Sequence, residues 1–532
     1  MKNWIWLLLV LVGVKATAQP KLAIGIVVDQ MRYDYLLRYA DRYCDSGFKR
    51  LMGEGYVFTN ARYDYVPTYT GPGHASIYTG TTPANHGIVA NDWYDRQRGD
   101  MMYCAEDSLS ELIGGRGMAM SPRNLLANTM TDQLAIASKK RSKIIGISIK
   151  DRGAILPAGH AANGAYWYDS KSGKLQSSDW YGDALPHWVE AFNRRGLALK
   201  YLDQTWNTLF PIESYMESSA DSNGYEGSLQ KGKAPVFPYD LREIQKERGY
   251  GLLSFTPFGN QYLVEATLAA LDGEKMGADE ICDFLCLSFS CTDYAGHFFG
   301  PQSVEVEDIY LRLDREIARL LYELDQKVGS GNYTVFLTAD HGANQVPSYL
   351  QSMGMPGGLF EIDSVAHRIE QAMMAKYQES FLLRVFNEQV YLNKKRIREK
   401  GLPLGEVEEL VADALKEMPG VFATWTPHDV WNGATDYLAH IRNGYMPSRS
   451  GDLFIQFLPG WMEHWPYGTS HGSGYTYDTH VPVLFYGYGV PKGRSNRRIS
   501  TTDIAPSMCE ILHISFPNAC TGNPLSELGT HP

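Results

Sequence analysis

Cysteine is scarce in this chain, with seven among 532 residues. That density is far below the level at which disulfides replace a hydrophobic core in small secreted domains. Because seven is odd, at least one thiol is expected to be free or to pair outside the chain. Cys282 and Cys286 lie around an apolar, strand-like run. Buried thiols are common in such runs, and a thiolate zinc site at this pair is the less favoured alternative.

Long hydrophobic runs are almost missing as well. One apolar run, from Trp4 to Val14, follows Lys2 and precedes Ala16-Thr17-Ala18, an A-x-A-like cleavage pattern. The run is shorter than the ~20 residues that a spanning helix needs, so residues 1–18 are predicted to be a signal peptide rather than a membrane anchor. No cysteine follows the run, which argues against a lipoprotein. We expect the mature chain, residues 19–532, to be soluble and periplasmic or secreted.

Positive charge is in deficit. Lysine and arginine number 49 against 60 acids, and the formal net charge is -11. Loss of residues 1–18 removes Lys2 and Lys15 and no acid, which gives -11 - 2 = -13. An acidic chain is a poor general binder of nucleic acids, so no specific nucleic-acid partner is expected. An anionic substrate would therefore need local positive charge, from metal ions or a few placed cations.

Apolar, strand-like runs alternate with helix-like stretches along most of the chain. This order predicts an α/β fold: a three-layer, doubly wound and mostly parallel sheet with helices on both faces. A large inserted cap near 154–278 and a second, smaller insertion near 351–450 interrupt the pattern. The expected strands lie within residues 21–32, 142–152, 283–297, 333–342 and 481–490, and the expected helices within 34–52, 125–140 and 303–328.

Three of the expected strands end in ligand-type side chains. Asp29 ends the first, Asp293 and His297 follow a later one, and Asp340 with His341 follows another. Ligands of such sheets bind beyond the carboxyl ends of the strands. His471 lies between glycines in GTSHGSGY, which would let the backbone pack close to a crowded site. Each residue alone has an ordinary structural explanation, but together they predict a carboxylate and imidazole site for Zn²⁺ or a similar ion.

Several hydroxyls compete for the role of nucleophile in the stretch YDYVPTYTGPGHASIYTG, residues 63–80. Thr68, Thr70, Ser76 and Thr79 all lie there, and no Walker-type GK[ST] accompanies them. Thr70 precedes Gly71-Pro72-Gly73, and proline is favoured in the first turn of a helix. A hydroxyl at a helix N-terminus faces backbone N–H groups that favour negative charge. His74 is a conceivable base, although metal activation is the better supported alternative.

The motifs together resemble the alkaline phosphatase superfamily, and within it the phosphate-irrepressible (PafA-type) bacterial alkaline phosphatases. The resemblance spans residues 21–490 in the expected order, and it rests on VVDQMRYDYL, PTYTGPGHASIYTGTTPANHGIVANDWYD, SIKDRGAILPAGH, CTDYAGHFFGP, LTADHG and GTSHGSGYTYDTHVPVLFYG. It implies two Zn²⁺ ions: one held by Asp293, His297 and His471, and a second held by Asp29, Asp340, His341 and the nucleophile oxygen. It also makes Thr70 the nucleophile and sets Asn91, Lys150 and Arg152 against the phosphoryl oxygens.

The resemblance implies hydrolysis of small phosphate monoesters to alcohol and inorganic phosphate through a phosphothreonine. Metal ions lower the pKa of a bound oxygen, which explains why no neighbouring base is needed. Lys150 and Arg152 favour a monoester, whose terminal phosphate carries an additional charged oxygen. The main alternative is a phosphodiesterase or nucleotide pyrophosphatase with the same metal core. A sulfatase is disfavoured, because this chain lacks the C/S-x-P-x-R motif that a sulfatase needs. A phosphomutase is disfavoured, because such an enzyme is expected in the cytosol. A non-enzymatic metal- or glycan-binding protein is the remote alternative.

Overall fold

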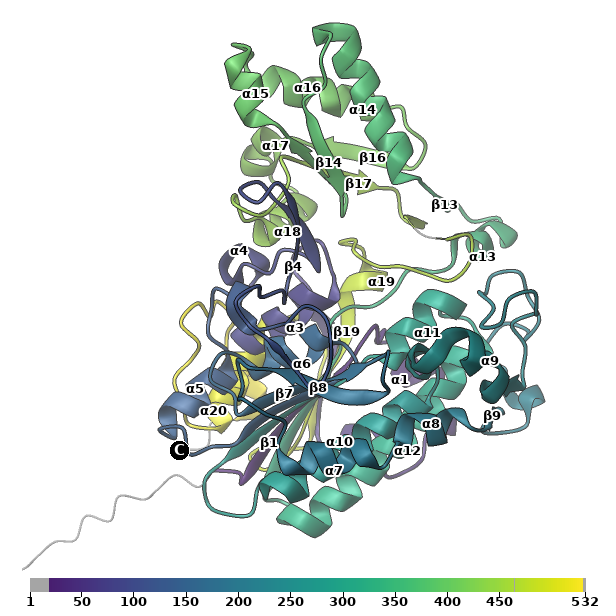
Figure 1. Ribbon diagram of the computed structural model, residues 1–532, viewed down its shortest axis with the longest axis vertical. Helices are drawn as coiled ribbons and strands as arrows, with labels where there is room; N and C mark the ends of the chain where they lie inside the picture. The colour runs from purple at the N-terminus through teal and green to yellow at the C-terminus, as the bar shows by residue number, and fades with distance from the viewer. Residues whose placement is uncertain (1–18, 464, 530–532) are drawn as a thin grey trace, which may run out of the picture.

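Figure 1 shows the protein as a computed structural model, which describes residues 19–463 and 465–529. The predicted signal peptide, residues 1–18, lies outside the described residues. Within them, no helix combines the length and the apolar character that crossing a membrane requires. All seven cysteines are free thiols. Burial raises the pKa of Cys282 and Cys286, and neither thiol belongs to a group of three or more metal-binding side chains among the described residues.

The described residues form a central 11-stranded sheet that is parallel in its middle. Its parallel strands are β12 (Tyr333–Thr338), β1 (Leu22–Val28), β11 (Asp283–Phe289), β6 (Ile144–Ser148) and β7 (Gly164–Asp169), in that spatial order. Antiparallel strands β19 (His480–Gly487) and β8 (Lys174–Ser178) flank this group on its two sides. The predicted α/β class with a mostly parallel sheet is confirmed.

Both faces of the sheet are covered by helices, which gives the predicted three layers (Figure 1). Leu22, Ile24, Ile26 and Val28 of β1 pack into one core, while Ala23 and Val27 point to the opposite one. This alternation follows from the two-residue period of a strand. The first core contains α10 (Phe258–Glu274) and α12 (Val304–Leu324), and the second contains α3 (Thr70–Thr79), α5 (Met130–Ala137) and α20 (Ile504–Ile511).

The helix expected over 34–52 is instead three short pieces: α1 (Tyr35–Arg38), a 3₁₀ turn (Ala40–Arg42) and α2 (Phe48–Glu54). The carboxylate of Asp314 on α12 accepts hydrogen bonds from the backbone N–H groups of Cys44 at 2.6 Å and Phe48 at 2.7 Å. It takes the place of the helical carbonyl acceptors, so the chain can turn at this point. The helix expected over 303–328 is confirmed by α12, and only part of 125–140 is helical, as α5.

The two ranges expected as insertions differ in structure. Residues 154–278 include β7 and β8, which belong to the central sheet, and helices α7 (His187–Arg194), α8 (Leu197–Leu202), α9 (Leu241–Arg248) and α10. Residues 351–450 provide most of a smaller unit, which contains a four-stranded sheet and has its own hydrophobic core. In Figure 1 this unit lies beyond one end of the central sheet. Its elements are α14 (Ile362–Tyr377), α16 (Leu404–Leu415), β14 (Leu382–Phe386), β15 (Gln389–Leu392), β16 (Val421–Trp425) and β17 (Leu453–Phe457).

Candidate metal and phosphoryl-transfer site

The predicted ligand residues meet at one edge of the central sheet. Strands β12, β1 and β11 are parallel neighbours, so their carboxyl ends lie side by side. Asp29 follows β1, Asp340 and His341 follow β12, and Asp293 lies in the first turn of α11 (Cys291–Phe299), directly after β11. His471 reaches the same place from the loop between β18 (Trp461–Met462) and α19 (Thr476–Thr479).

Their ligand atoms form two overlapping groups. Asp293, His297 and His471 make up one, and Asp29, Asp293 and His341 make up the other, with all ligand atoms of each group within 4.8 Å of one another. Asp293 Oδ1 lies 3.2 Å from His297 Nε2 and 3.7 Å from His471 Nε2. Asp340 borders the second group, with Oδ2 3.6 Å from His341 Nε2. The structure thus brings all six predicted side chains together, and Asp293 joins both groups.

The three imidazoles are all held through Nδ1. His297 Nδ1 is 2.7 Å from the carbonyl oxygen of Thr469, His471 Nδ1 is 2.7 Å from that of Thr68, and His341 Nδ1 is 2.9 Å from that of Gly342. A carbonyl accepts only, so each Nδ1 carries the proton and each Nε2 presents its lone pair. Histidines that bind metals are oriented in this way. Burial lowers the pKa of His341 and His471, which keeps both in the neutral form that a metal needs.

The carboxylates carry more buried negative charge than the protein alone offsets. Asp29 and Asp340 are fully buried. Asp29 Oδ1 accepts no hydrogen bond from the described residues, Asp29 Oδ2 lies 2.8 Å from Lys150 Nζ, and Asp340 Oδ2 lies 3.3 Å from His74 Nδ1. Burial, together with the charges of Asp293 and Asp340, raises the pKa of Asp29 well above its usual range. Three buried carboxylates with a single ammonium among them, beside neutral imidazoles, fit bound divalent cations. The donor set, mixed oxygen and nitrogen, suits zinc or a similar first-row ion.

Thr70 is the hydroxyl that faces this set. It begins α3, is almost fully buried, and its Oγ1 lies 3.5 Å from His341 Nε2 and 3.4 Å from Lys150 Nζ. The other candidates are occupied elsewhere. Thr68 Oγ1 donates to the carbonyl of Ser473, Thr79 Oγ1 donates to that of Ala75, and Ser76 Oγ bonds to His86. Of the four hydroxyls, only that of Thr70 lies at both the helix N-terminus and the ligand cluster.

Lys150 lies at the centre of the acidic cluster. Its Nζ is 2.8 Å from Asp29 Oδ2 and 2.5 Å from Asp293 Oδ2. Burial acts to lower the pKa of Lys150, but the two carboxylates outweigh it and raise the pKa, so the ammonium stays charged. Burial also opposes ionisation of Asp293, but the charges of His297 and Lys150 hold its pKa well below the usual range. A fixed cation therefore lies beside the hydroxyl of Thr70.

Arg152 and Asn91 are the other two residues predicted to contact the phosphoryl oxygens. The strand expected within residues 142–152 would include Lys150 and Arg152 at its end. The strand β6 ends at Ser148, and Lys150 and Arg152 lie at the start of α6 (Asp151–Ala158). Arg152 donates to the hydroxyl of Tyr103 at 3.0 Å, and its Nε has no partner in the described chain. Asn91 Oδ1 accepts the backbone N–H of Gly71 at 2.7 Å, which leaves its amide NH₂ for another acceptor.

Sequence reasoning missed Gln30 and underestimated His74 as a structural residue. Gln30 donates its amide to Asp293 Oδ1 at 2.9 Å and its backbone N–H to Asp340 Oδ1 at 3.1 Å, so it links two carboxylates. Its φ of 63° is unusual for a non-glycine residue, and no sequence signal marks it. His74 Nδ1 lies 2.9 Å from the carbonyl of Thr70 and 3.3 Å from Asp340 Oδ2, so it is not bonded to the Thr70 hydroxyl as a base.

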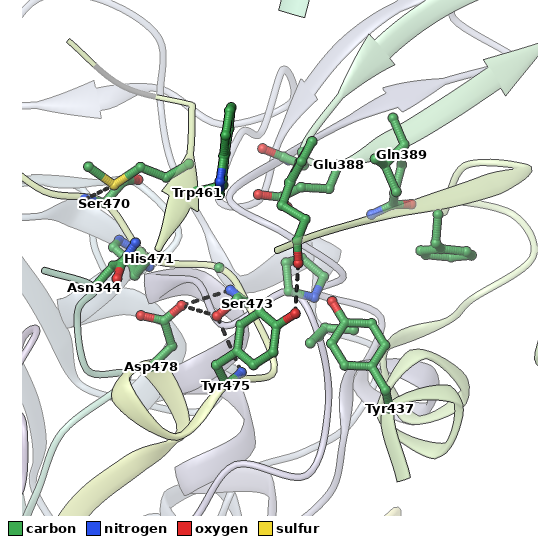
Figure 2. Close-up of a pocket in the computed structure, with 18 of the residues that line it drawn as sticks. Asn344, Glu388, Gln389, Tyr437, Trp461, Ser470, His471, Ser473, Tyr475 and Asp478 are labelled. Atoms are coloured by element: carbon green, nitrogen blue, oxygen red, sulfur yellow. Dashed lines mark hydrogen bonds between the residues drawn. The ribbon is translucent and has the colours of Figure 1, made fainter. Parts of the chain in front are cut away.

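A cavity lies beside His471, between the four-stranded sheet that contains β15 and β17 and the loop that carries His471. Figure 2 shows His471, Ser473 and Asp478 on one side and Glu388 and Tyr437 on the other. The carboxylate of Glu388 accepts the hydroxyl of Tyr69 at 3.2 Å, and the Tyr69 ring meets His471 edge-on at 5.4 Å. Glu388, in the turn between β14 and β15, therefore contacts the residue directly before Thr70.

Comparison with known proteins gives a consistent family. The chain is 42% identical to alkaline phosphatase PafA of Elizabethkingia meningoseptica over 99% of both chains. It is 41% identical to alkaline phosphatase PhoV of Synechococcus elongatus, over 97% of this chain and 94% of the relative. A Myroides odoratus protein named calcium-transporting ATPase is 43% identical, over 96% of this chain and 94% of the relative.

The fold comparison agrees with the sequence comparison. A crystal structure of wild-type alkaline phosphatase PafA superposes with a TM-score of 0.94 at 42% identity, covering 97% of this chain and all of that one. The model of the type I phosphodiesterase / nucleotide pyrophosphatase family matches residues 23–480. The metal-ligand cluster and the sheet edge that carries it lie inside this match. The chain belongs to the type I phosphodiesterase / nucleotide pyrophosphatase family of the alkaline phosphatase superfamily, and its close relatives include PafA and PhoV.

Proposed function

We propose that this protein is an exported, metal-dependent alkaline phosphatase that hydrolyses small phosphate monoesters to alcohol and inorganic phosphate. The observation that carries the proposal is the position of the Thr70 hydroxyl, at a helix N-terminus, 3.4 Å from Lys150 Nζ and 3.5 Å from His341 Nε2. The names of the full-length relatives PafA and PhoV support the same activity. Export is proposed from the signal-peptide pattern of residues 1–18.

Two zinc ions are the proposed cofactors. Asp293, His297 and His471 would hold one, and Asp29, Asp340, His341 and Thr70 would hold the other. The buried carboxylates of Asp29 and Asp340 and the Nε2 lone pairs of the three histidines support this assignment. Bound zinc lowers the pKa of the attacking oxygen and offsets negative charge on the leaving oxygen.

The chemistry assigned to the chain itself is two displacements at phosphorus. Thr70 Oγ1 forms a bond to phosphorus while the bond from phosphorus to the ester oxygen breaks and the alcohol leaves. Water then attacks the phosphothreonine, phosphate departs, and the Thr70 hydroxyl is restored. Two in-line steps predict net retention of configuration at phosphorus. Phosphoryl transfer depends mainly on positioning and charge, which the N-terminus of α3 and the fixed ammonium of Lys150 supply.

Lys150 and Arg152 are the proposed reason for monoester selectivity. A monoester dianion carries one more charged oxygen than a diester, and the two cations at the start of α6 give that oxygen partners. Asn91 would donate its free amide to a second phosphoryl oxygen. The alternative is a phosphodiesterase or nucleotide pyrophosphatase, the activity in the name of the matching family model. A phosphodiesterase needs an apolar partner for the second ester group rather than a second cation.

Hydrolysis of p-nitrophenyl phosphate against bis-p-nitrophenyl phosphate tests the proposal. The zinc-loaded protein should have the higher kcat/KM for the monoester, and EDTA should remove that activity. A higher kcat/KM for the diester would favour the alternative. If a folded and zinc-loaded sample turns over neither ester, the hypothesis of a non-enzymatic metal- or glycan-binding protein would be favoured instead.

A further inference from the structure

A pair of buried glutamates faces each other away from the site described above. Glu305 lies in the first turn of α12, and Glu226 lies in the long connection between β9 (Thr205–Trp206) and β10 (Tyr239–Asp240). Glu305 is fully buried and Glu226 is 8% exposed. Their carboxyl groups lie within hydrogen-bonding reach of each other. Two carboxyl groups that meet in the interior need a proton or a cation between them.

Each carboxyl group is satisfied on one oxygen only. The hydroxyl of Tyr239 donates to Glu305 Oε1, and the amide of Asn223 donates to Glu226 Oε1 at 2.5 Å. The Oε2 atoms of both glutamates are buried and accept no hydrogen bond from any donor in the described chain. No lysine or arginine of that part of the chain forms an ion pair with either group. The side chain of Asp221 adds further negative charge beside both.

The negative charge of two ionised carboxylates at this buried position would have to be neutralised. Burial raises the pKa of Glu226 to about 10 and that of Glu305 to about 8, and the charge of Asp221 adds to both shifts. A divalent cation would let both groups ionise and would cancel their summed charge. The metal-binding groups of this pair are carboxylate oxygens, and neither histidine nor cysteine is among their partners in the described chain. Such a set suits a hard cation with flexible coordination, which is Ca²⁺ rather than zinc.

We propose that Glu226 and Glu305 bind a Ca²⁺ ion through their unpartnered Oε2 atoms, at a site separate from the active-site metals. Backbone carbonyls and water would complete its coordination. The ion would hold the connection that carries Glu226 against the N-terminus of α12.

This connection supports the segments that carry two of the candidate zinc ligands. Gly227 donates its N–H to the carbonyl of Phe298, the residue after His297, at 2.8 Å. Tyr225 accepts the N–H of Gly468, three residues before His471, at 2.8 Å. Both bonds are made by immediate neighbours of Glu226. Ca²⁺ bound at this glutamate is therefore expected to stabilise the loop that packs on His297 and His471.

Terbium luminescence on the full chain, with its active site already loaded with zinc, tests the proposal directly. Tb³⁺ occupies calcium sites, and Tyr239 and Trp206, whose rings lie 5.4 Å apart, would sensitise its emission. We expect an emission component that Ca²⁺ displaces, and at least a tenfold weaker Tb³⁺ affinity in Glu226→Gln and in Glu305→Gln. Glu213→Gln, at an exposed neighbouring position, should behave as wild type. Absence of a calcium-displaceable component in wild type, or an unchanged component in both variants, would overturn the proposal.

Thermal unfolding separates the ion from a shared proton. Glutamine at position 305 can donate its amide to Glu226, so Glu305→Gln is expected to fold. Ca²⁺ should raise the Tm of the zinc-loaded wild type and leave the Tm of Glu305→Gln unchanged. If a proton alone joins the two carboxyl groups, Ca²⁺ will not change the Tm of wild type, and that result contradicts the site.

Discussion

Charge around a single hydroxyl is the main feature at the scale of the residue. His74 does not act as a base on Thr70 Oγ1, because its Nδ1 is turned toward the Thr70 carbonyl and Asp340. What surrounds Thr70 instead is the ammonium of Lys150 and the Nε2 atom of His341. Its reactivity is therefore expected to come from neighbouring positive charge, including metal ions, rather than from His74.

Lys150→Ala and Arg152→Ala should each lower kcat/KM for p-nitrophenyl phosphate more than for bis-p-nitrophenyl phosphate. Loss of a buried, placed charge partner costs on the order of 10²–10³ in rate when it acts on developing charge. The ratio of the two kcat/KM values measures the effect and cancels any general loss of folded protein. Arg141→Ala, an exposed cation before β6, is a matched control and should leave the ratio unchanged. Equal losses on both substrates would refute the role of charge in selecting monoesters.

Some site residues follow from sequence pattern and others do not. Asp29, Asp293 and Asp340 could be predicted to meet because each directly follows a parallel strand, and such strand ends share one edge. Gln30 could not be found in this way, since its role depends on a left-handed backbone conformation that brings its amide to Asp293. The link between Tyr69 and Glu388 could not be found either, because it joins residues far apart in the sequence. The catalytic and metal roles of the predicted residues stay predictions.

At the scale of the secondary-structure element, the position of Thr70 depends on close packing between α3 and the end of β12. Gly73 N donates to the carbonyl of Tyr69, and a Cβ at Gly73 would overlap the backbone of Asp340. The helix that begins with Thr70 can thus approach the strand end that carries Asp340 and His341 only because residue 73 has no side chain. The nucleophile and the metal ligands are held together by this packing.

Gly73→Ala is expected to destabilise the fold and to reduce turnover strongly, because α3 must move away from Asp340. Overpacking of a tight interior typically costs roughly 1–3 kcal/mol. Gly53→Ala is the control, since Gly53 lies in α2 and a Cβ there meets nothing within 4 Å. That change should be neutral or stabilising by up to about 1 kcal/mol. Urea unfolding and p-nitrophenyl phosphate turnover measure the two effects, and an active, stable Gly73→Ala protein would show that the contact is unimportant.

Prediction of elements worked where periodicity was strong and failed where side chains intervened. The run 303–328 has an uninterrupted amphipathic pattern and forms α12. The run 34–52 has a helical composition, but Asp314, which is distant in sequence, takes the N–H groups of Cys44 and Phe48 and divides it. A single sequence does not reveal such a long-range acceptor. The position of β7 and β8 in the central sheet is likewise a matter of tertiary pairing.

Metal ions are expected to stabilise the whole molecule, since the sheet edge concentrates Asp29, Asp293 and Asp340 in its interior with one ammonium among them. Chelation should remove phosphatase activity and lower the Tm by several degrees, because a ligand that binds only the folded state adds stability. Zn²⁺ added after chelator removal should restore activity, and differential scanning calorimetry with a parallel activity assay measures both. Full activity and an unchanged Tm after verified metal removal would contradict a metal-dependent site.

The most direct measurement is mass spectrometry of Thr70 after turnover is stopped with acid. The zinc-loaded protein is mixed with excess p-nitrophenyl phosphate, quenched within the first turnover and digested. We predict a phosphate group on Thr70 in the wild type and its absence in Thr70→Ala, which should retain zinc and lose turnover by at least about a thousandfold. Phosphate found on another residue, or near-normal turnover by zinc-loaded Thr70→Ala, would contradict the account.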